Sequence, residues 1–125
     1  MRPRSLTLTP KELAIMKVMW RLEQGTVRDV YECLREKREI AYTTVMTMMG
    51  ILEEKGYLKR MRVDRPFVYK PAHSREHVIA GMVRDFVDRV FDGAASTLLV
   101  HLTQQERMTK ADRERIRQLI AETEE

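Results

Sequence analysis

The first 35 residues show apolar positions at helical spacing behind clear helix-start signals. Thr9 offers a capping hydroxyl, Pro10 occupies the first helical position, and Glu12 stands three residues after the cap. This predicts a helix over residues 10–23 that Gly25 ends. Its apolar residues are too many for one narrow stripe, so we expect this helix to lie deep in the core.

Two further helices are predicted before the period changes. Thr26 caps the second, whose apolar residues recur at the i, i+3, i+4 and i+7 positions from Val27 onward. A charged turn at residues 36–39 leads to a third helix over residues 42–55. Gly56 closes it, because glycine readily takes the left-handed conformation that often ends a helix.

After Tyr57 the apolar residues alternate with polar ones instead of recurring at helical spacing. Residues 58–63 and 67–70 read as two short strands, and residues 64–66 form the turn between them. Three helices followed by a hairpin predict a winged helix-turn-helix over residues 1–72. The chain as a whole is therefore expected to be mainly α with a small β-hairpin.

Three apolar segments in residues 73–125 predict a helical dimerisation region. Ser74 caps a long helix that Gly93 stops, residues 98–102 form a short apolar helix, and Thr109 caps a last one. Their apolar faces exceed what one thin helical layer can bury, so we expect a homodimer. The expected interface residues are Ile79, Met82, Val83, Phe86, Val90, Leu98, Leu99, Leu102, Ile116, Leu119 and Ile120.

Charge is distributed unevenly along the chain, whose net charge is +4. Residues 1–72 carry 15 Lys and Arg against 9 Asp and Glu, whereas residues 73–125 carry 8 against 10. Residues 55–70 hold six basic side chains and one acid, Asp64. A basic first half suits a polyanion, since cationic side chains that neutralise phosphates release counterions. The hairpin is either a wing on DNA or a solvated edge protected by charge.

One side of the predicted third helix carries small residues. At 100° per residue, Val45, Met48, Met49 and Leu52 fall on a packing side, and Thr43, Thr47, Gly50 and Glu54 fall opposite. Small hydroxyl residues let a helix approach base edges in a major groove. For Gly50, close approach to DNA, close helix packing and no role are all open. The expected contacts to double-stranded DNA are Tyr42, Thr43, Thr44, Thr47, Gly50, Arg60, Arg62 and Arg65.

No metal site, cofactor or enzymatic activity is expected. Residues 73–77 match the H-x-x-E-H pattern of one class of zinc peptidases. His73 precedes the cap at Ser74, so the two imidazoles should not project together. The methionines are expected to fill the core, with Met46 partly exposed, and Cys33 should lie at the core edge. No acid, base and nucleophile set converges.

The location expected is the cytoplasm, without membrane insertion. No run of about 18 apolar residues occurs, and residues 1–10 lack the apolar centre of a secretory signal. One cysteine allows no internal disulfide, which agrees with a reducing compartment.

Several segments resemble the BlaI/MecI family of penicillinase and methicillin-resistance repressors. The matching segments are residues 8–13 (LTPKEL), 18–20 (VMW), 26–30 (TVRDV), 41–49 (AYTTVMTMM), 52–58 (LEEKGYL) and 69–71 (YKP). The resemblance implies a winged helix, a helical dimerisation region and repression at dyad operators. It also implies release when a membrane sensor peptidase or a downstream protease leads to cleavage in the C-terminal region.

Two departures from the family pattern bear on the switch. The best-known members are cut at an Asn-Phe bond, and this chain contains no asparagine. The copper-responsive branch carries paired C-terminal cysteines, which this chain lacks. Two alternatives stay open: a ligand-sensing winged-helix regulator with an effector pocket along residues 74–92, and a protein interaction module that does not bind DNA.

Overall fold

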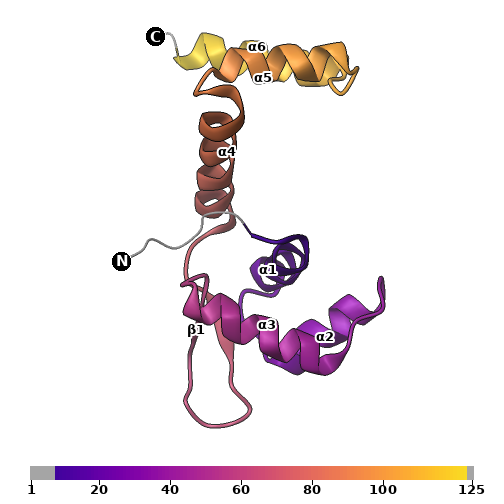
Figure 1. The fold of residues 1–125 in the computed structure, drawn as a ribbon, viewed down its shortest axis with the longest axis vertical. Helices are drawn as coiled ribbons and strands as arrows, with labels where there is room; N and C mark the ends of the chain where they lie inside the picture. Colours follow the sequence, from indigo (N-terminus) through magenta and orange to yellow (C-terminus); the bar gives the residue numbers. More distant parts are fainter. Residues whose placement is uncertain (1–7, 124–125) are drawn as a thin grey trace. The chain divides into compact units, whose positions relative to one another are not determined.

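The computed structural model describes residues 8–123, which form helices and one antiparallel hairpin (Figure 1). The elements in order are α1 Pro10–Leu22, α2 Val27–Arg35, α3 Tyr42–Glu54, β1 Leu58–Arg60, β2 Tyr69–Pro71, α4 Arg75–Phe91, α5 Ala95–Gln104 and α6 Lys110–Thr123. Their type and order confirm the predicted fold class, mainly α with a small hairpin.

Side-chain caps start α1 and α2 where the sequence predicts them. Thr9 and Glu12 form a reciprocal capping box, in which the Thr9 hydroxyl accepts from the Glu12 amide and the Glu12 carboxylate accepts from the Thr9 amide. Thr26 and Asp29 form the equivalent box at α2. Each box satisfies two amides that have no partner within the helix, so the starts of both helices are fixed locally.

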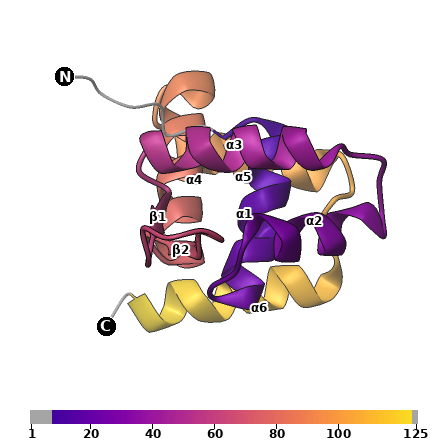
Figure 2. The same cartoon turned by 90° about the horizontal axis from the view of Figure 1, so that it is seen from below.

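The core lies between α1, α2, α3 and the hairpin. In Figure 2 the hairpin lies beside α1 and one end of α3, and β1 contacts α3 while β2 contacts α1. α1 is the central helix, as its dense apolar pattern indicates, and it contacts both α2 and α3. The fully buried side chains are Ile15, Met16, Met19, Val30, Val45, Met49, Leu52 and Leu58.

The end of α1 differs from the prediction. The helix ends at Leu22, and the residue that closes it is Glu23, with a positive φ of 72°, rather than Gly25. Gly25 is instead buried and pairs with Tyr69 through two backbone hydrogen bonds of 2.9 and 2.8 Å. A Cβ at Gly25 would lie 3.2 Å from the carboxylate of Asp29, so the glycine leaves room for the side chain that caps α2.

The strands of the hairpin are shorter than predicted. β1 and β2 pair over three residues each, and one further bond joins the Met61 amide to the Val68 carbonyl at 2.7 Å. The segment between them is an exposed loop that extends beyond the paired strands in Figure 1, and we call residues 61–68 the wing. Val63 is 84% exposed. Alternating apolar residues extend a ladder only where one face can be buried, and the wing tip offers no such face.

The chain divides into two compact units, residues 1–83 and 84–125, with the boundary inside α4. Val78 and Val87 are the buried residues of α4, and Val78 belongs to the core of the first unit. Gly93 follows α4 with a φ of +84°, as expected of a helix stop. The division by role at residues 72 and 73 stays a prediction.

None of the helices described between residues 8 and 123 is both long enough and apolar enough to cross a membrane.

Candidate nucleic-acid interface

The helix α3 buries one side and exposes the other, as its pattern predicts. Val45, Met49 and Leu52 are fully buried, and Met48 is half-buried. Thr43 and Thr47 are exposed on the opposite side, where Tyr42 and Met46 are also exposed. The exposed side therefore offers hydroxyl groups and one aromatic ring on a helix that the core holds rigidly.

Gly50 faces open space on this exposed side. A Cβ built on Gly50 would have no heavy atom within 4 Å, the helix's own nearby backbone aside. Close packing of another described helix therefore does not explain this glycine, and that interpretation is wrong. A smooth, open patch is left in the middle of α3, next to Thr47.

A buried ion pair holds the end of α3 against the start of α1. The ammonium of Lys55 donates to both carboxylate oxygens of Glu12, at 2.8 and 3.1 Å, and Glu12 is only 3% exposed. Burial by itself raises the pKa of Glu12, but the Lys55 ammonium and the Thr9 amide outweigh it, so the pKa lies below its ordinary value. The pair fixes the position of α3 relative to α1.

Arg60 connects α3 to the wing. Its Nε donates to the Glu53 carboxylate at 2.8 Å, and its guanidinium stacks over the ring of Phe67 at 4.4 Å. The hydrogen bond from Arg60 to Glu53 raises the pKa of Arg60 above its already high ordinary value. Arg60 therefore has two intramolecular contacts, which the sequence-based assignment to DNA did not anticipate.

The other predicted wing residues are more open. Arg62 is exposed and Arg65 is exposed, with the guanidinium of Arg65 5.6 Å from the centre of the Phe67 ring. Both lie in the loop between β1 and β2, in the same unit as α3. The structure thus brings the predicted wing cations and the predicted helix residues onto one unit.

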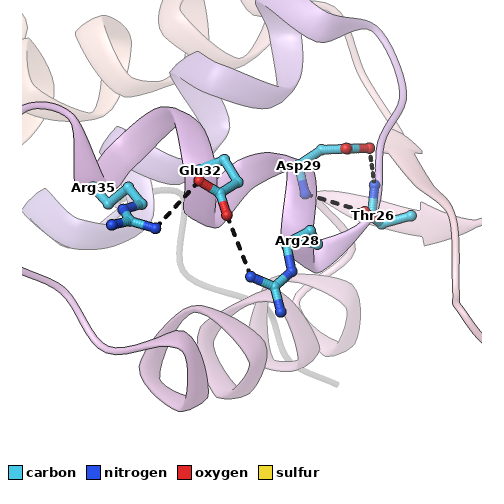
Figure 3. A network of polar contacts seen from close by, with 5 residues as sticks. All are labelled: Thr26, Arg28, Asp29, Glu32 and Arg35. Atoms are coloured by element: carbon cyan, nitrogen blue, oxygen red, sulfur yellow. Dashed lines mark hydrogen bonds and ion pairs between the residues drawn. The ribbon is translucent and has the colours of Figure 1, made fainter.

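Sequence reasoning missed a charged network on α2 next to the start of α3 (Figure 3). Glu32 pairs with Arg28 at 3.3 Å and with Arg35 at 3.5 Å. The guanidinium of Arg28 also lies 5.0 Å from the ring centre of Tyr42, the first residue of α3. The spacing of Arg28, Glu32 and Arg35 on one helix face was a usable signal, but the prediction for α2 rested on its apolar stripe alone.

The histidines of the H-x-x-E-H motif lie closer than expected. The ring centroids of His73 and His77 are 5.0 Å apart, so the expectation that they project apart is wrong. The indole N–H of Trp20 donates to the His73 carbonyl at 3.1 Å, which holds the backbone just before α4. Within residues 8–123, no three side chains of His, Cys, Asp or Glu gather closely enough to hold a metal ion.

The sulfur-containing residues are mostly packing residues. Cys33 is half-buried and packs against the core, which confirms its place at the core edge. Met46 is exposed beside the hydroxyl residues, as predicted, whereas Met61 at the start of the wing is exposed rather than core filler. The strand ladder ends there, so no sheet face covers it.

Known proteins resemble this chain over nearly its whole length. Residues 8–122 match the family described as penicillinase repressor. The transcriptional regulator BlaI of Mycobacterium tuberculosis is 37% identical over 115 residues, covering 90% of this chain and 82% of that protein. The methicillin resistance regulatory protein MecI of Staphylococcus aureus is 17% identical over 113 residues, covering 90% of this chain and 92% of that protein.

A solved structure shows a related fold together with DNA. It is the solution structure of the monomeric form of BlaI from Bacillus licheniformis in complex with the blaP half-operator. Its TM-score is 0.50 at 28% sequence identity, and the match covers 61% of this chain and 92% of that chain. The chain belongs to the penicillinase repressor family, as the resemblance of its segments implied.

Proposed function

We propose that this chain represses transcription by binding dyad operator DNA as a homodimer, with α3 in the major groove and the wing on the adjacent backbone. The observation that carries the proposal is the exposed, small-residue side of α3 beside the cationic wing. The likeness to a BlaI structure that holds a half-operator supports it. A repressor of this kind needs no catalytic step, and we place it in the cytoplasm with the DNA.

The helix and the wing have different roles in this proposal. Thr43, Thr44 and Thr47 read base edges, because a threonine hydroxyl can donate or accept and its methyl can contact thymine. Gly50 lets the groove edge approach the helix backbone. Tyr42 and the wing cations contact the sugar-phosphate backbone, which fixes the register without reading sequence.

Arg60 has a modified role in the proposal. It adds positive charge near the DNA, but its contacts with Glu53 and Phe67 make it chiefly a connection between the wing and α3. Arg62 and Arg65 are the wing residues with guanidinium groups directed to the phosphates or the minor groove, where negative potential favours arginine.

Several apolar side chains are exposed in the single chain, and their exposure supports the proposal that the protein is a homodimer. Val83, Phe86 and Val90 repeat along one side of α4 and are all exposed. No described residue of α5 or α6 is buried. Helices with no fully buried side chain leave apolar area for a partner, and a second copy matches the two-fold symmetry of a dyad operator. The other residues expected at this interface are half-buried or exposed, and Met82 also packs on the winged-helix core.

Selection of bound duplexes from a random-sequence pool tests the proposal directly. The purified full chain should enrich an inverted repeat whose half-sites lie about one helical turn apart, or a multiple of that. We call the enriched duplex the operator. Fluorescence anisotropy should then show an operator affinity at least about a thousandfold above that of a scrambled duplex. Enrichment of no motif would reject sequence-specific repression.

The ligand-sensing alternative is not favoured. The hollow beside the first turn of α4 is open and lined by a mixture of basic and acidic side chains, among them Lys17, Arg21, Glu23 and Arg75. An effector pocket is typically enclosed and lined mostly by apolar side chains, and this hollow is neither. Release by proteolysis stays a prediction, with the segment 98–102 now placed inside α5.

A further inference from the structure

A cleft of about 790 Å³ separates α3 from the wing. The residues that form it come from the start of α2, the first turns of α3, and the wing with the start of β2: Thr26, Val27, Arg28, Tyr42, Met46, Arg65, Pro66, Phe67 and Tyr69. The lining includes two arginines and no acidic side chain. Its floor is apolar and aromatic, and its charge is entirely positive.

A second hollow, over the later turns of α3, has a different lining. It is lined by Glu53, Glu54 and Arg60 together with Thr47, Gly50 and Ile51. The charge of Arg60 is already balanced there by Glu53 at 2.8 Å. A phosphate group is therefore attracted to the cleft between α3 and the wing more strongly than to the hollow with the two glutamates, where Thr47 and Gly50 face uncharged base edges in the proposed function.

Arg28 is held in place to bind an anion at this cleft. Its guanidinium lies 5.0 Å from the ring centre of Tyr42 and 5.8 Å from that of Tyr31, within the range of cation–π attraction. Figure 3 shows Arg28 and Arg35 on either side of Glu32. One contact to Glu32 leaves most of the five N–H donors of Arg28 available, and its side chain is 63% exposed.

The arrangement of the major and minor grooves in duplex DNA indicates which part of the DNA would lie in the cleft. A protein with a helix in the major groove and a wing over the neighbouring minor groove straddles the single sugar-phosphate strand that separates them. Deoxyribose rings can pack on an apolar floor, while phosphates need cations on the walls.

We propose that this cleft seats that strand, and that Arg28 from α2 and Arg65 from the wing bind its phosphates from opposite walls. This inference rests on the proposed function and adds α2 to the DNA-binding surface. The ring of Tyr42 orients Arg28, so the first residue of α3 acts on the backbone through Arg28 as well as by itself.

Arg28→Gln tests the proposal, and Arg35→Gln is its matched control. Arg35 shares the Glu32 partner and stacks on Tyr31, yet it does not line the cleft. By anisotropy, Arg28→Gln should weaken binding to operator and scrambled duplexes alike, by about five- to tenfold at 0.1 M salt. It should also reduce the salt slope by about 1. Arg35→Gln should change both quantities much less, and both variants should keep the thermal midpoint of the wild type.

A scan with single methylphosphonate linkages identifies the phosphate. In the wild type, neutralising one particular phosphate per half-site should weaken binding about as much as Arg28→Gln does. In the Arg28→Gln protein the same linkage should cause no further loss of affinity. In the Arg35→Gln protein it should weaken binding as much as it does in the wild type. If the loss of affinity caused by each linkage adds in full to the loss caused by Arg28→Gln at every phosphate, Arg28 binds none of these phosphates. That result would overturn the proposed binding of the strand, even if operator preference is intact. Absence of operator preference in the wild type would instead overturn the proposed function.

A small aromatic anion is the competing occupant of the cleft. With 2-naphthoate as the probe, we expect no saturable binding at millimolar concentration in calorimetry. Saturable binding that Arg28→Gln abolishes, combined with unchanged DNA binding by that variant, would overturn the assignment to the DNA backbone.

Discussion

Single residues control whether α3 is held in the right place, and Glu12 is the clearest case. It is a buried carboxylate whose charge is matched by Lys55 and by the amide of Thr9. Because these contacts lower its pKa, the folded protein binds the proton less tightly than the unfolded chain does. The stabilisation is therefore complete well above pH 4.5, the ordinary value, and is lost as the pH falls through the lowered folded-state pKa.

Replacing Glu12 with Gln should lower the free energy of unfolding by about 1.5–3 kcal/mol at pH 7, since the neutral side chain has one acceptor oxygen and cannot match the charge of Lys55. Urea unfolding at a fixed protein concentration measures the difference, which should narrow as the pH is lowered below 4.5. Glu54→Gln is the control, because Glu54 is exposed on the same part of the chain. A difference that does not depend on pH would contradict the role of the ion pair.

Gly50 separates stability from DNA binding at one position. Ala in place of a glycine inside a helix stabilises by about 0.5–1 kcal/mol, and nothing within 4 Å opposes the new methyl group. We therefore expect Gly50→Ala to raise the thermal midpoint yet weaken operator binding about tenfold, because the methyl group blocks close approach.

Gly81→Ala is the matched control for Gly50→Ala. Gly81 lies inside α4, and the methyl group of an alanine there would also project into open space. The substitution should raise the midpoint by a similar amount and leave the affinity for operator unchanged in anisotropy titrations. Equal operator binding by the two variants would show that Gly50 is not at the DNA surface.

At the scale of elements, the relation between α3 and the wing determines whether both can contact DNA at once. Two short strands constrain the position of the wing only weakly, since their paired residues end at Arg60 and Tyr69. The additional contacts of Arg60 with Glu53 and Phe67 join the two elements directly. Geometry as well as charge is therefore needed at position 60.

Arg60→Lys should lower operator affinity about fivefold although the charge is kept, because lysine cannot reproduce the planar stack and the Nε hydrogen bond. Arg62→Lys is the comparison at an exposed wing position and should change the affinity less than twofold. Anisotropy titrations at one salt concentration measure both. If the two variants behave alike, Arg60 acts only through its charge.

Some features of the helices and the hairpin could be predicted from the sequence, and others could not. Local signals placed the starts of α1 and α2 and the end of α3 correctly, because capping boxes and the left-handed Gly56 act within a few residues. The start of α5 at Ala95 has no side-chain cap, and it lies before the predicted segment 98–102. Gly25 was misread because its strand-like pairing with Tyr69 joins segments 44 positions apart. Burial of the α3 side was predictable from the helical period. The contacts of Arg28 with Tyr42 and of Arg60 with Phe67 were not predictable, since each depends on how separate elements pack.

For the whole molecule, dimerisation decides whether two copies of α3 can bind one dyad operator. Leu119 and Ile120 are exposed on α6, 43% and 50% respectively, and no described residue of that helix is buried. Burial of these side chains against a second copy would supply the apolar area that the single chain lacks.

Leu119→Glu should raise the dimer dissociation constant about a hundredfold, or about 2.8 kcal/mol, because it places a charge in the apolar interface. Sedimentation equilibrium at micromolar concentration measures it. Gln118→Glu adds the same charge on the same helix away from the apolar stripe and should leave the dimer intact. A wild-type chain that sediments as a monomer would reject the interface.

The central claim, that α3 reads sequence while the wing supplies charge, is tested most directly by the ratio of operator to scrambled-duplex affinity. We would measure that ratio by anisotropy at several salt concentrations for the wild type, Thr47→Arg and Arg62→Ala. Thr47→Arg should bring the ratio close to 1. Arg62→Ala should weaken both duplexes about equally and reduce the salt slope by about 1. A Thr47→Arg protein that keeps the wild-type ratio would contradict the account.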